Sequence, residues 1–205
     1  MSARDAILSR LGGTAVQGAI DAEAAALLIA PERPRVDPDR LEETFLAMLT
    51  LPSIAATVDR IDTLDALPHA VATYLAAQGL PPALCTPPDP RVTSNDWSGL
   101  TLHEQVAPDE NAVLAFARCG VAETGSLVFE TSPTAPMLPN FLALHHIVVV
   151  TRIVAQLEDA ALLGTQPRAH YWVTGVSGTT DIEGTYVRGA HGPRFLHVIL
   201  APASR

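Results

Sequence analysis

The chain contains no lysine, and all 13 of its basic residues are arginine. With 22 acidic residues, its formal net charge is −9. Without lysine it has neither a Schiff-base lysine nor the phosphate-binding lysine of a P-loop. The acidic balance, with no run of basic side chains, is unfavourable for binding nucleic acid or an anionic membrane surface. We therefore expect neither nucleic acid nor a membrane among its partners.

Cysteine is also scarce, with only Cys85 and Cys119 present. Two cysteines cannot ligate a four-cysteine zinc site or iron–sulfur cluster within one chain. His145 and His146 are adjacent in a predicted strand, so their side chains leave by opposite faces and cannot chelate one ion together. His197, inside an apolar strand, is expected to be a hydrogen-bonded core residue. The sequence predicts buried free thiols, no metal site and no cofactor.

Three further patterns are missing. There is no G-x-S-x-G serine-hydrolase motif and no G-x-G-x-x-G dinucleotide fingerprint. The longest apolar stretch, 141–150, is about half the length needed to span a bilayer. The first residues carry mixed charge and lack the apolar core of a signal peptide. The expected location is cytoplasmic.

What is present is an alternation of strands and helices. Residues 1–50 have helical patterns, and residues 54–200 alternate between strand-like runs and helical segments, including a helix expected over 153–163. The runs 145–151 and 195–200 are nearly continuous in apolar character apart from their histidines, which is typical of strands buried on both faces. We predict an α/β fold with a central mixed, largely parallel sheet and helices on both faces. The predicted domains are an N-terminal helical cap over 1–50 and an α/β domain over 51–205.

Three glycine-containing turns adjoin predicted strands. The first, 121–126, contains Glu123, Thr124 and Gly125. A carboxylate in such a turn can act as a nucleophile or general base if burial raises its pKa. The alternative is a hairpin turn whose polar side chains only satisfy backbone amides.

The second turn, 175–184, contains Ser177, Thr179 and Asp181. Thr180 to Glu183 fits a capping box, which predicts a short helix beginning at Asp181. Free amides at a helix start can hold a small anionic ligand such as a phosphate or carboxylate. The alternative is a cap with no ligand.

The third turn, 188–194, places His191 and Arg194 before the last strand. Histidine can act there as an acid or base, and arginine can hold a carboxylate or phosphate. Since ligands collect at loops that leave the strand ends of open α/β sheets, we expect the three turns to share one pocket. The expected catalytic groups are Glu123, Asp181 and His191. The expected substrate-binding groups are Thr124, Gly125, Ser177, Thr179 and Arg194.

Four segments in order, 121–129 (VAETGSLVF), 146–150 (HIVVV), 181–183 (DIE) and 189–199 (GAHGPRFLHVI), resemble the lactate-utilisation protein C family, also called the LUD-domain family. The similarity covers roughly residues 50–201 and implies a fold like that of ribose-5-phosphate isomerase and the CoA transferases. It also implies a part in oxidising L-lactate to pyruvate, beside partner proteins that carry iron–sulfur clusters.

The chain departs from that family at one place. The family usually has Gly-Pro-Ser, often followed by Arg-Thr, before Asp-Ile-Glu, whereas positions 175–180 here are Gly-Val-Ser-Gly-Thr-Thr. Lactate specificity therefore does not follow from the resemblance. Two functions remain open: an accessory subunit of a lactate-oxidising complex, or an enzyme on a small carboxylate, phosphosugar or acyl-CoA with Glu123 as nucleophile or base.

Overall fold

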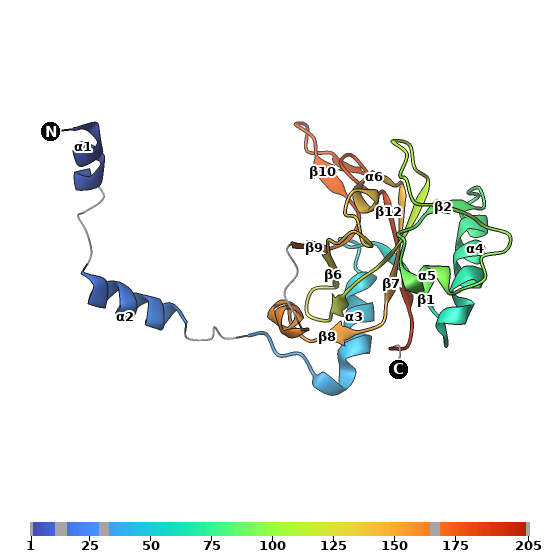
Figure 1. Ribbon diagram of the computed structural model, residues 1–205, viewed down its shortest axis with the longest axis horizontal. Coiled ribbons are helices and arrows are strands. Elements are labelled where there is room, and N and C mark those ends of the chain that lie inside the picture. The colour runs from blue at the N-terminus through green and yellow to red at the C-terminus, as the bar shows by residue number, and fades with distance from the viewer. Residues whose placement is uncertain (1, 11–15, 29–32, 165–168, 204–205) are drawn as a thin grey trace. The chain divides into compact units, whose positions relative to one another are not determined.

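The structure is a computed structural model that describes residues 2–10, 16–28, 33–164 and 169–203 (Figure 1). Its contacts divide the chain into two units, Met1–Arg35 and Val36–Arg205. The first unit contains helices α1 (Ala3–Arg10) and α2 (Gln17–Leu27), neither of which has a buried residue. Helix α3 (Leu41–Leu49) belongs to the second unit. A domain boundary at residue 50 stays a prediction.

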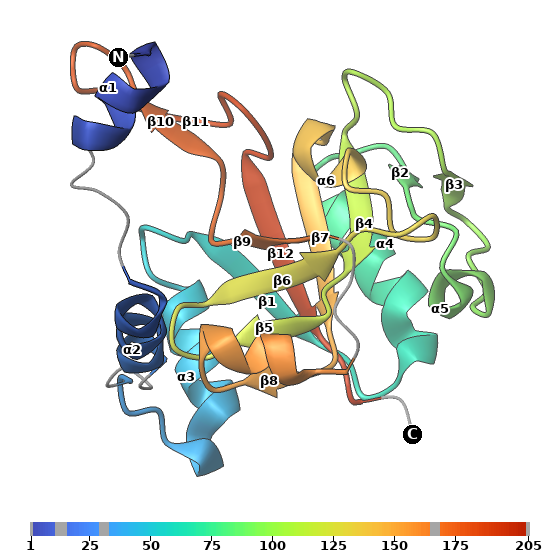
Figure 2. The same cartoon turned by 60° about the vertical axis from the view of Figure 1, so that its left-hand side comes forward.

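The second unit is built on six parallel strands in the order β1-β12-β7-β4-β2-β3 (Figure 2). Their bounds are β1 (Ala56–Arg60), β2 (Ala83–Cys85), β3 (Thr101–His103), β4 (Ala112–Phe116), β7 (His145–Val150) and β12 (Phe195–Leu200). The two apolar runs are β7 and β12, side by side within the sheet. The predicted α/β fold and its parallel central sheet are confirmed.

The two faces of this sheet bury alternate residues of each strand. Ile147 and Val149 of β7 pack in the cluster that contains helix α4 (Leu67–Ala77). Val148 and Val150 pack in the opposite cluster, which contains α3. Figure 2 shows α4 on one side of the sheet and α3 on the other. Helices on both faces, as predicted, exclude water from the sheet.

A smaller mixed sheet lies in the same cluster as α3, in the order β8-β5-β6-β9. Its strands are β5 (Cys119–Val121), β6 (Ser126–Glu130), β8 (Ile153–Val154) and β9 (His170–Val173). The helix predicted over 153–163 is wrong in its first part. The β-branched pair Ile153 and Val154 pairs in parallel with β5, and only η3 (Leu157–Leu162), a 3-10 helix, follows.

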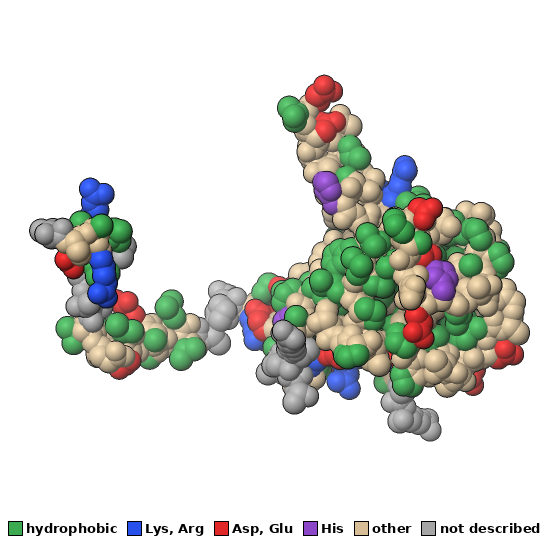
Figure 3. Space-filling model, turned by 45° about the horizontal axis from the view of Figure 1, so that its top comes forward, with side chains coloured by type: hydrophobic (Ala, Val, Ile, Leu, Met, Phe, Trp, Pro, Cys, Tyr) green, Lys and Arg blue, Asp and Glu red, His purple; other side chains and the backbone are tan. Residues whose placement is uncertain are grey.

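The helix predicted to begin at Asp181 is also wrong. The segment forms an antiparallel hairpin of β10 (Gly178–Thr180) and β11 (Tyr186–Arg188), which projects from the second unit (Figures 2 and 3). The Asp181 carboxylate accepts the amides of Glu183 and Thr185, at 2.9 and 2.8 Å, and so closes a turn. Tyr186 lies directly against Gly178, where a helix would not place it.

The remaining short elements lie in the connections between the larger ones. They are the 3-10 helices η1 (Pro38–Arg40) and η2 (Leu64–Ala66) and the single-turn helices α5 (Pro90–Thr93) and α6 (Pro139–Leu142). Among the described helices, none combines the length and apolar character needed to cross a membrane.

Candidate functional site

The first predicted turn is tied to the segment after β9 by hydroxyl groups. Thr124 Oγ1 lies 2.7 Å from Ser126 Oγ, which lies 2.6 Å from Thr174 Oγ1. Gly125 has a φ of +69°, and a Cβ there would lie 2.9 Å from Ile54 Cδ1. Glycine is therefore required in this turn, both for its backbone conformation and for the close approach of Ile54.

The second and third predicted turns are joined by backbone hydrogen bonds. The amide of Ser177 donates to the carbonyl of Pro193 at 2.9 Å, and the amide of Gly189 donates to the carbonyl of Ser177 at 2.8 Å. Gly175, with a φ of +85°, approaches Ile54 so closely that a Cβ would lie 2.8 Å from Ile54 Cα. Ile54 therefore contacts both Gly125 and Gly175, and the three turns form one connected region.

This region contains a cavity of about 190 Å³, which we call the Ser177 pocket. It lies near the amino ends of β7 and β12. Gly192 keeps the space beside Ser177 open, because a Cβ there would lie 3.2 Å from Ser177 Cβ. The pocket is lined by Asn140, Phe141, His146, Trp172, Val173, Gly175, Ser177, His191, Gly192, Pro193 and Leu196.

His146 is one of two buried polar side chains that line this pocket, together with Asn140. It is 1% exposed, it stacks on Phe129 with ring centroids 5.5 Å apart, and neither ring nitrogen has a partner among the described residues. Burial lowers the pKa of His146 to about 3, so its imidazole is neutral near pH 7. A neutral imidazole offers one donor and one acceptor, and leaving both unpaired costs about 1–3 kcal/mol each. A polar ligand in the pocket would satisfy them.

Of the predicted catalytic residues, only His191 lines the Ser177 pocket. Glu123 is half-buried, its amide donates to Ala155 at 3.0 Å, and its carboxylate has no partner among the described residues. Asp181 is exposed, and its carboxylate accepts hydrogen bonds from backbone amides of its own turn. The meeting of all three groups in one pocket stays a prediction.

Of the predicted substrate-binding residues, Ser177 lines the pocket. Thr124 and Gly125 belong to the turn joined to it through Ile54 and the hydroxyl chain. Thr179 lies in β10, on the projecting hairpin. The Arg194 side chain packs against Gly189, and its guanidinium lies 5.8 Å from the centre of the Phe195 ring.

Three lining residues are not indicated by any sequence pattern: Asn140, His146 and Trp172. The alternation of His145 and His146 was predicted correctly: His145 Nδ1 lies 2.9 Å from Tyr74 Oη of α4, while His146 faces Phe129 of the smaller sheet. That alternation alone gave no reason to place His146 in a pocket, because the other face of the strand was expected to be apolar core.

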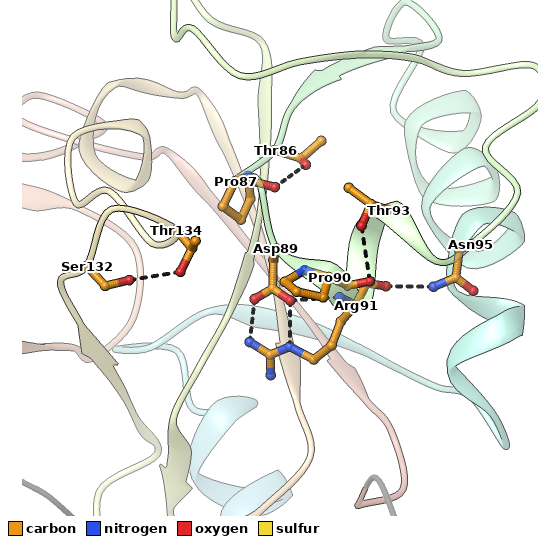
Figure 4. A network of polar contacts seen from close by, with 9 residues as sticks. All are labelled: Thr86, Pro87, Asp89, Pro90, Arg91, Thr93, Asn95, Ser132 and Thr134. Atoms are coloured by element: carbon orange, nitrogen blue, oxygen red, sulfur yellow. Dashed lines mark hydrogen bonds and ion pairs between the residues drawn. The ribbon is translucent and has the colours of Figure 1, made fainter.

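A second cavity, of about 170 Å³, lies at the carboxyl ends of β2, β4 and β7 and is lined in part by Asp89, Arg91, Phe116 and Asn140. Ligands of open α/β sheets bind at such ends. Here, however, Arg91 is paired with Asp89 at 2.6 Å (Figure 4). Its guanidinium also lies over the Phe116 ring, 4.0 Å from the ring centre. Burial would raise the pKa of Asp89, but the hydrogen bonds and charge of Arg91 outweigh it, and the pKa is lowered. Arg118, the other arginine that lines this cavity, is paired with Glu130 at 2.6 Å, so both guanidinium groups already have a carboxylate partner.

One group of side chains could hold a metal ion. The donor atoms of Cys85, His103 and Glu110 all lie within 4.8 Å of one another. They come from β2, β3 and the turn before β4, and no sequence spacing reveals them. Both cysteines are buried free thiols, and burial raises the pKa of each to about 11, with the nearby carboxylates of Glu110 and Glu104 adding to the effect at Cys85.

Together, these features define an α/β protein with an open parallel sheet, a smaller mixed sheet against one face, and a pocket among glycine-rich turns. Residues 104–201 match the model of the LUD domain. The resemblance predicted from the four motifs is therefore confirmed for this part of the chain.

Two curated proteins are similar to this chain. An uncharacterized protein of Neisseria meningitidis serogroup B is 33% identical over 92 residues, which are 42% of this chain and 39% of that protein. Lactate utilization protein C of Deinococcus radiodurans is 31% identical over 101 residues, which are 44% of this chain and 46% of that protein. The matches thus span less than half the length of these relatives.

The crystal structure of a DUF162 family protein from Deinococcus radiodurans has a similar fold. Its TM-score is 0.58, with 18% sequence identity over 82% of this chain and 99% of that chain. At this identity the similarity shows the fold, and the α/β architecture is therefore shared with a solved structure.

Proposed function

We propose that this protein takes part in lactate utilisation, as an accessory subunit that acts beside iron–sulfur partner proteins in the cytoplasm during oxidation of L-lactate to pyruvate. The observation that carries the proposal is the match of residues 104–201 to the LUD domain, together with the relative named lactate utilization protein C. The cysteine count supports the accessory role. Cys85 and Cys119 lie in different core clusters, and an iron–sulfur cluster takes four such ligands.

The Ser177 pocket supports binding of a small hydroxy acid. A ligand with a carboxylate and a neighbouring hydroxyl carries both acceptors and a donor, which match the unpaired nitrogens of His146 and the hydroxyl of Ser177. His191 from the third turn adds a further polar group to the same cavity. The pocket is small, which favours a compact ligand.

An exposed apolar surface beside the pocket supports assembly with a partner. We call it the α6 patch. The Leu144 carbonyl accepts the amides of Arg194 and Phe195, at 3.0 and 3.1 Å, so α6 and the start of β12 are contiguous. Figure 3 shows hydrophobic side chains gathered below the projecting hairpin. Grouped apolar side chains on a surface mark contact sites. The patch consists of Met137, Leu138, Phe141, Leu142, Leu144 and Phe195.

The alternative function is an enzyme that acts on a small carboxylate, phosphosugar or acyl-CoA with Glu123 as nucleophile or base. The observation that favours it is the half-buried Glu123 carboxylate, which has no partner among the described residues. The hydroxyl chain from Thr124 to Thr174 holds the turn that carries it. A carboxylate can serve as the nucleophile in such chemistry.

Complementation of a strain that lacks the gene tests the proposal. The wild-type gene should restore growth on L-lactate as sole carbon source. Ser177→Ala and His191→Gln should each slow that growth, whereas Glu183→Gln, at the exposed tip of the hairpin, should not. Thermal melts of each protein separate loss of function from loss of folding. Normal growth of the deletion strain on lactate contradicts the proposed role.

Glu123→Gln separates the two functions. In the accessory role the variant restores growth, because no bond is made or broken at that carboxylate. In the enzymatic role it abolishes growth while its melting temperature stays unchanged.

Copurification tests the partners. Tagged wild-type protein from lactate-grown cells should retain iron–sulfur proteins, detected by bound iron and by mass spectrometry. Leu138→Asp in the α6 patch should release them. Leu51→Asp, at an exposed leucine outside the patch, is the matched control and should retain them.

A further inference from the structure

We propose that Cys85, His103 and Glu110 bind one divalent transition-metal ion, with zinc the best match. The proposal is independent of the proposed function, because these residues line neither the Ser177 pocket nor the α6 patch.

The sheet itself brings the three donors together. β2 and β3 are parallel neighbours in which Cys85 is the register partner of His103, so both side chains leave the same face. Cys85 is also the register partner of Val113 in β4, and Glu110 lies two residues before the start of that strand. The group therefore depends on strand pairing and not on a flexible loop.

The distances suit a small ion. The three donor atoms lie within 4.8 Å of one another, and His103 Nε2 is 2.8 Å from Glu110 Oε2. Zinc bonds of about 2.0–2.3 Å in tetrahedral geometry place donor atoms about 3.3–3.7 Å apart. The donors span that range, so modest side-chain rotation is enough to reach it.

The donor types select the ion. Thiolate and imidazole favour zinc over calcium and magnesium, which prefer oxygen ligands. On binding, the Cys85 thiol gives its proton to solvent. The proton on His103 Nε2 also passes to solvent while Nδ1 takes one up, so the imidazole stays neutral, and the hydrogen bond between His103 and Glu110 is replaced by two metal–ligand bonds. Three protein donors leave a fourth position for water. His103 is 37% exposed, which gives the ion a route from solvent.

The site would also fasten the connection between β3 and β4. Glu110 is 7% exposed, and the same carboxylate oxygen that meets His103 accepts the amide of Ala107 at 3.3 Å. Cys85 Sγ donates to the Glu104 carbonyl at 3.7 Å. An ion here would therefore hold the 104–110 connection against β2, and bound metal should stabilise the folded protein.

The test is titration of the chelator-treated full chain with zinc chloride, followed by calorimetry and native mass spectrometry. We expect one zinc per chain and a higher melting temperature. Cys85→Ser, His103→Gln and Glu110→Gln should each weaken zinc binding by more than about 100-fold, the upper end of what outer-sphere changes cost. Cys119→Ser, at the other buried cysteine, and His69→Gln, at an exposed histidine, should bind like the wild type.

Cobalt(II) gives a second measurement. Bound cobalt should show the thiolate charge-transfer band in wild type and in His69→Gln but not in Cys85→Ser. His103→Gln changes a partly exposed side chain and keeps the fold, so its loss of zinc binding with an unchanged melt supports the site. Absence of stoichiometric zinc binding by the wild type, or equal binding by His103→Gln, overturns it.

Discussion

Acid should destabilise this protein well above the pH at which carboxylates are protonated, and His146 should account for much of the effect. Burial lowers the pKa of His146 to about 3 in the folded state, against 6.5 in the unfolded chain. Below pH 6.5 this histidine is therefore protonated in the unfolded chain but stays neutral in the folded protein. The free energy of unfolding falls as the pH falls. At pH 4.5, two units lower, the loss is about 3 kcal/mol.

A second histidine behaves in the same way. Burial, opposed by the charge of Asp59, lowers the pKa of His197 to about 4. Its contribution at pH 4.5 is slightly smaller, about 2.5 kcal/mol, so the two together should remove about 5 kcal/mol. That is comparable with the whole stability of many domains, which is about 5–15 kcal/mol.

Urea unfolding at pH 7 and pH 4.5 measures the effect. Wild type should lose about 5 kcal/mol between these values, and His146→Leu should lose only about half as much. At pH 7, His146→Leu should be as stable as wild type or more so, because it removes two unpaired buried nitrogens. His69→Gln should lose as much as wild type. An equal loss in His146→Leu and wild type would refute the reasoning.

Three further predictions concern close packing and the thiols. Gly120→Ala should destabilise the protein by about 1–3 kcal/mol in chemical denaturation, because a Cβ would lie 2.5 Å from Phe45 Cζ, and Phe45→Leu should recover part of that loss. Gly175→Ala should cost at least about 1 kcal/mol through its φ of +85°, with further loss from contact with the Ile54 backbone; a melt equal to wild type contradicts this. Cys85 and Cys119 in metal-free protein should react slowly with a thiol reagent at pH 8 until denaturant is added, since burial raises both pKa values to about 11; fast labelling of the folded chain would count against their burial.

Local patterns predicted the centre of the fold well. Helices and the smaller sheet cover both faces of β7 and β12. Strands covered on both faces are nearly continuous apolar runs, and such runs can be recognised in the sequence. His197 was expected to be a hydrogen-bonded core residue, and its Nδ1 lies 2.8 Å from Thr57 Oγ1.

Strand pairing explains why both predicted helices are wrong. Ile153 and Val154 were taken into a helix because their neighbours have helical spacing, but β5 supplies a strand partner that periodicity cannot reveal. At 175–184 the capping-box pattern favours a helix. The structure has a hairpin instead, in which β10 pairs with β11 and Tyr186 packs on Gly178. Local signals were outweighed by pairing in both segments.

The candidate site was predictable only in part. Glycine-rich turns indicated Ser177 and His191, because strand-end loops commonly form pockets. His146 lay hidden in an apolar run, and Cys85, His103 and Glu110 meet only through the register of β2, β3 and β4. No spacing along the chain carries that register.

The position of β12 has a consequence for how the chain folds during synthesis. Within the six-stranded sheet β1 pairs with β12 alone, and the hydrogen bond from Thr57 to His197 joins residues 140 apart. A ribosome adding about 5–20 residues per second needs about 7–28 s to make that intervening chain. Throughout this interval β1 has an open edge, able to pair with the wrong strand. A chaperone that shields one short edge until β12 emerges would protect the nascent protein from aggregation.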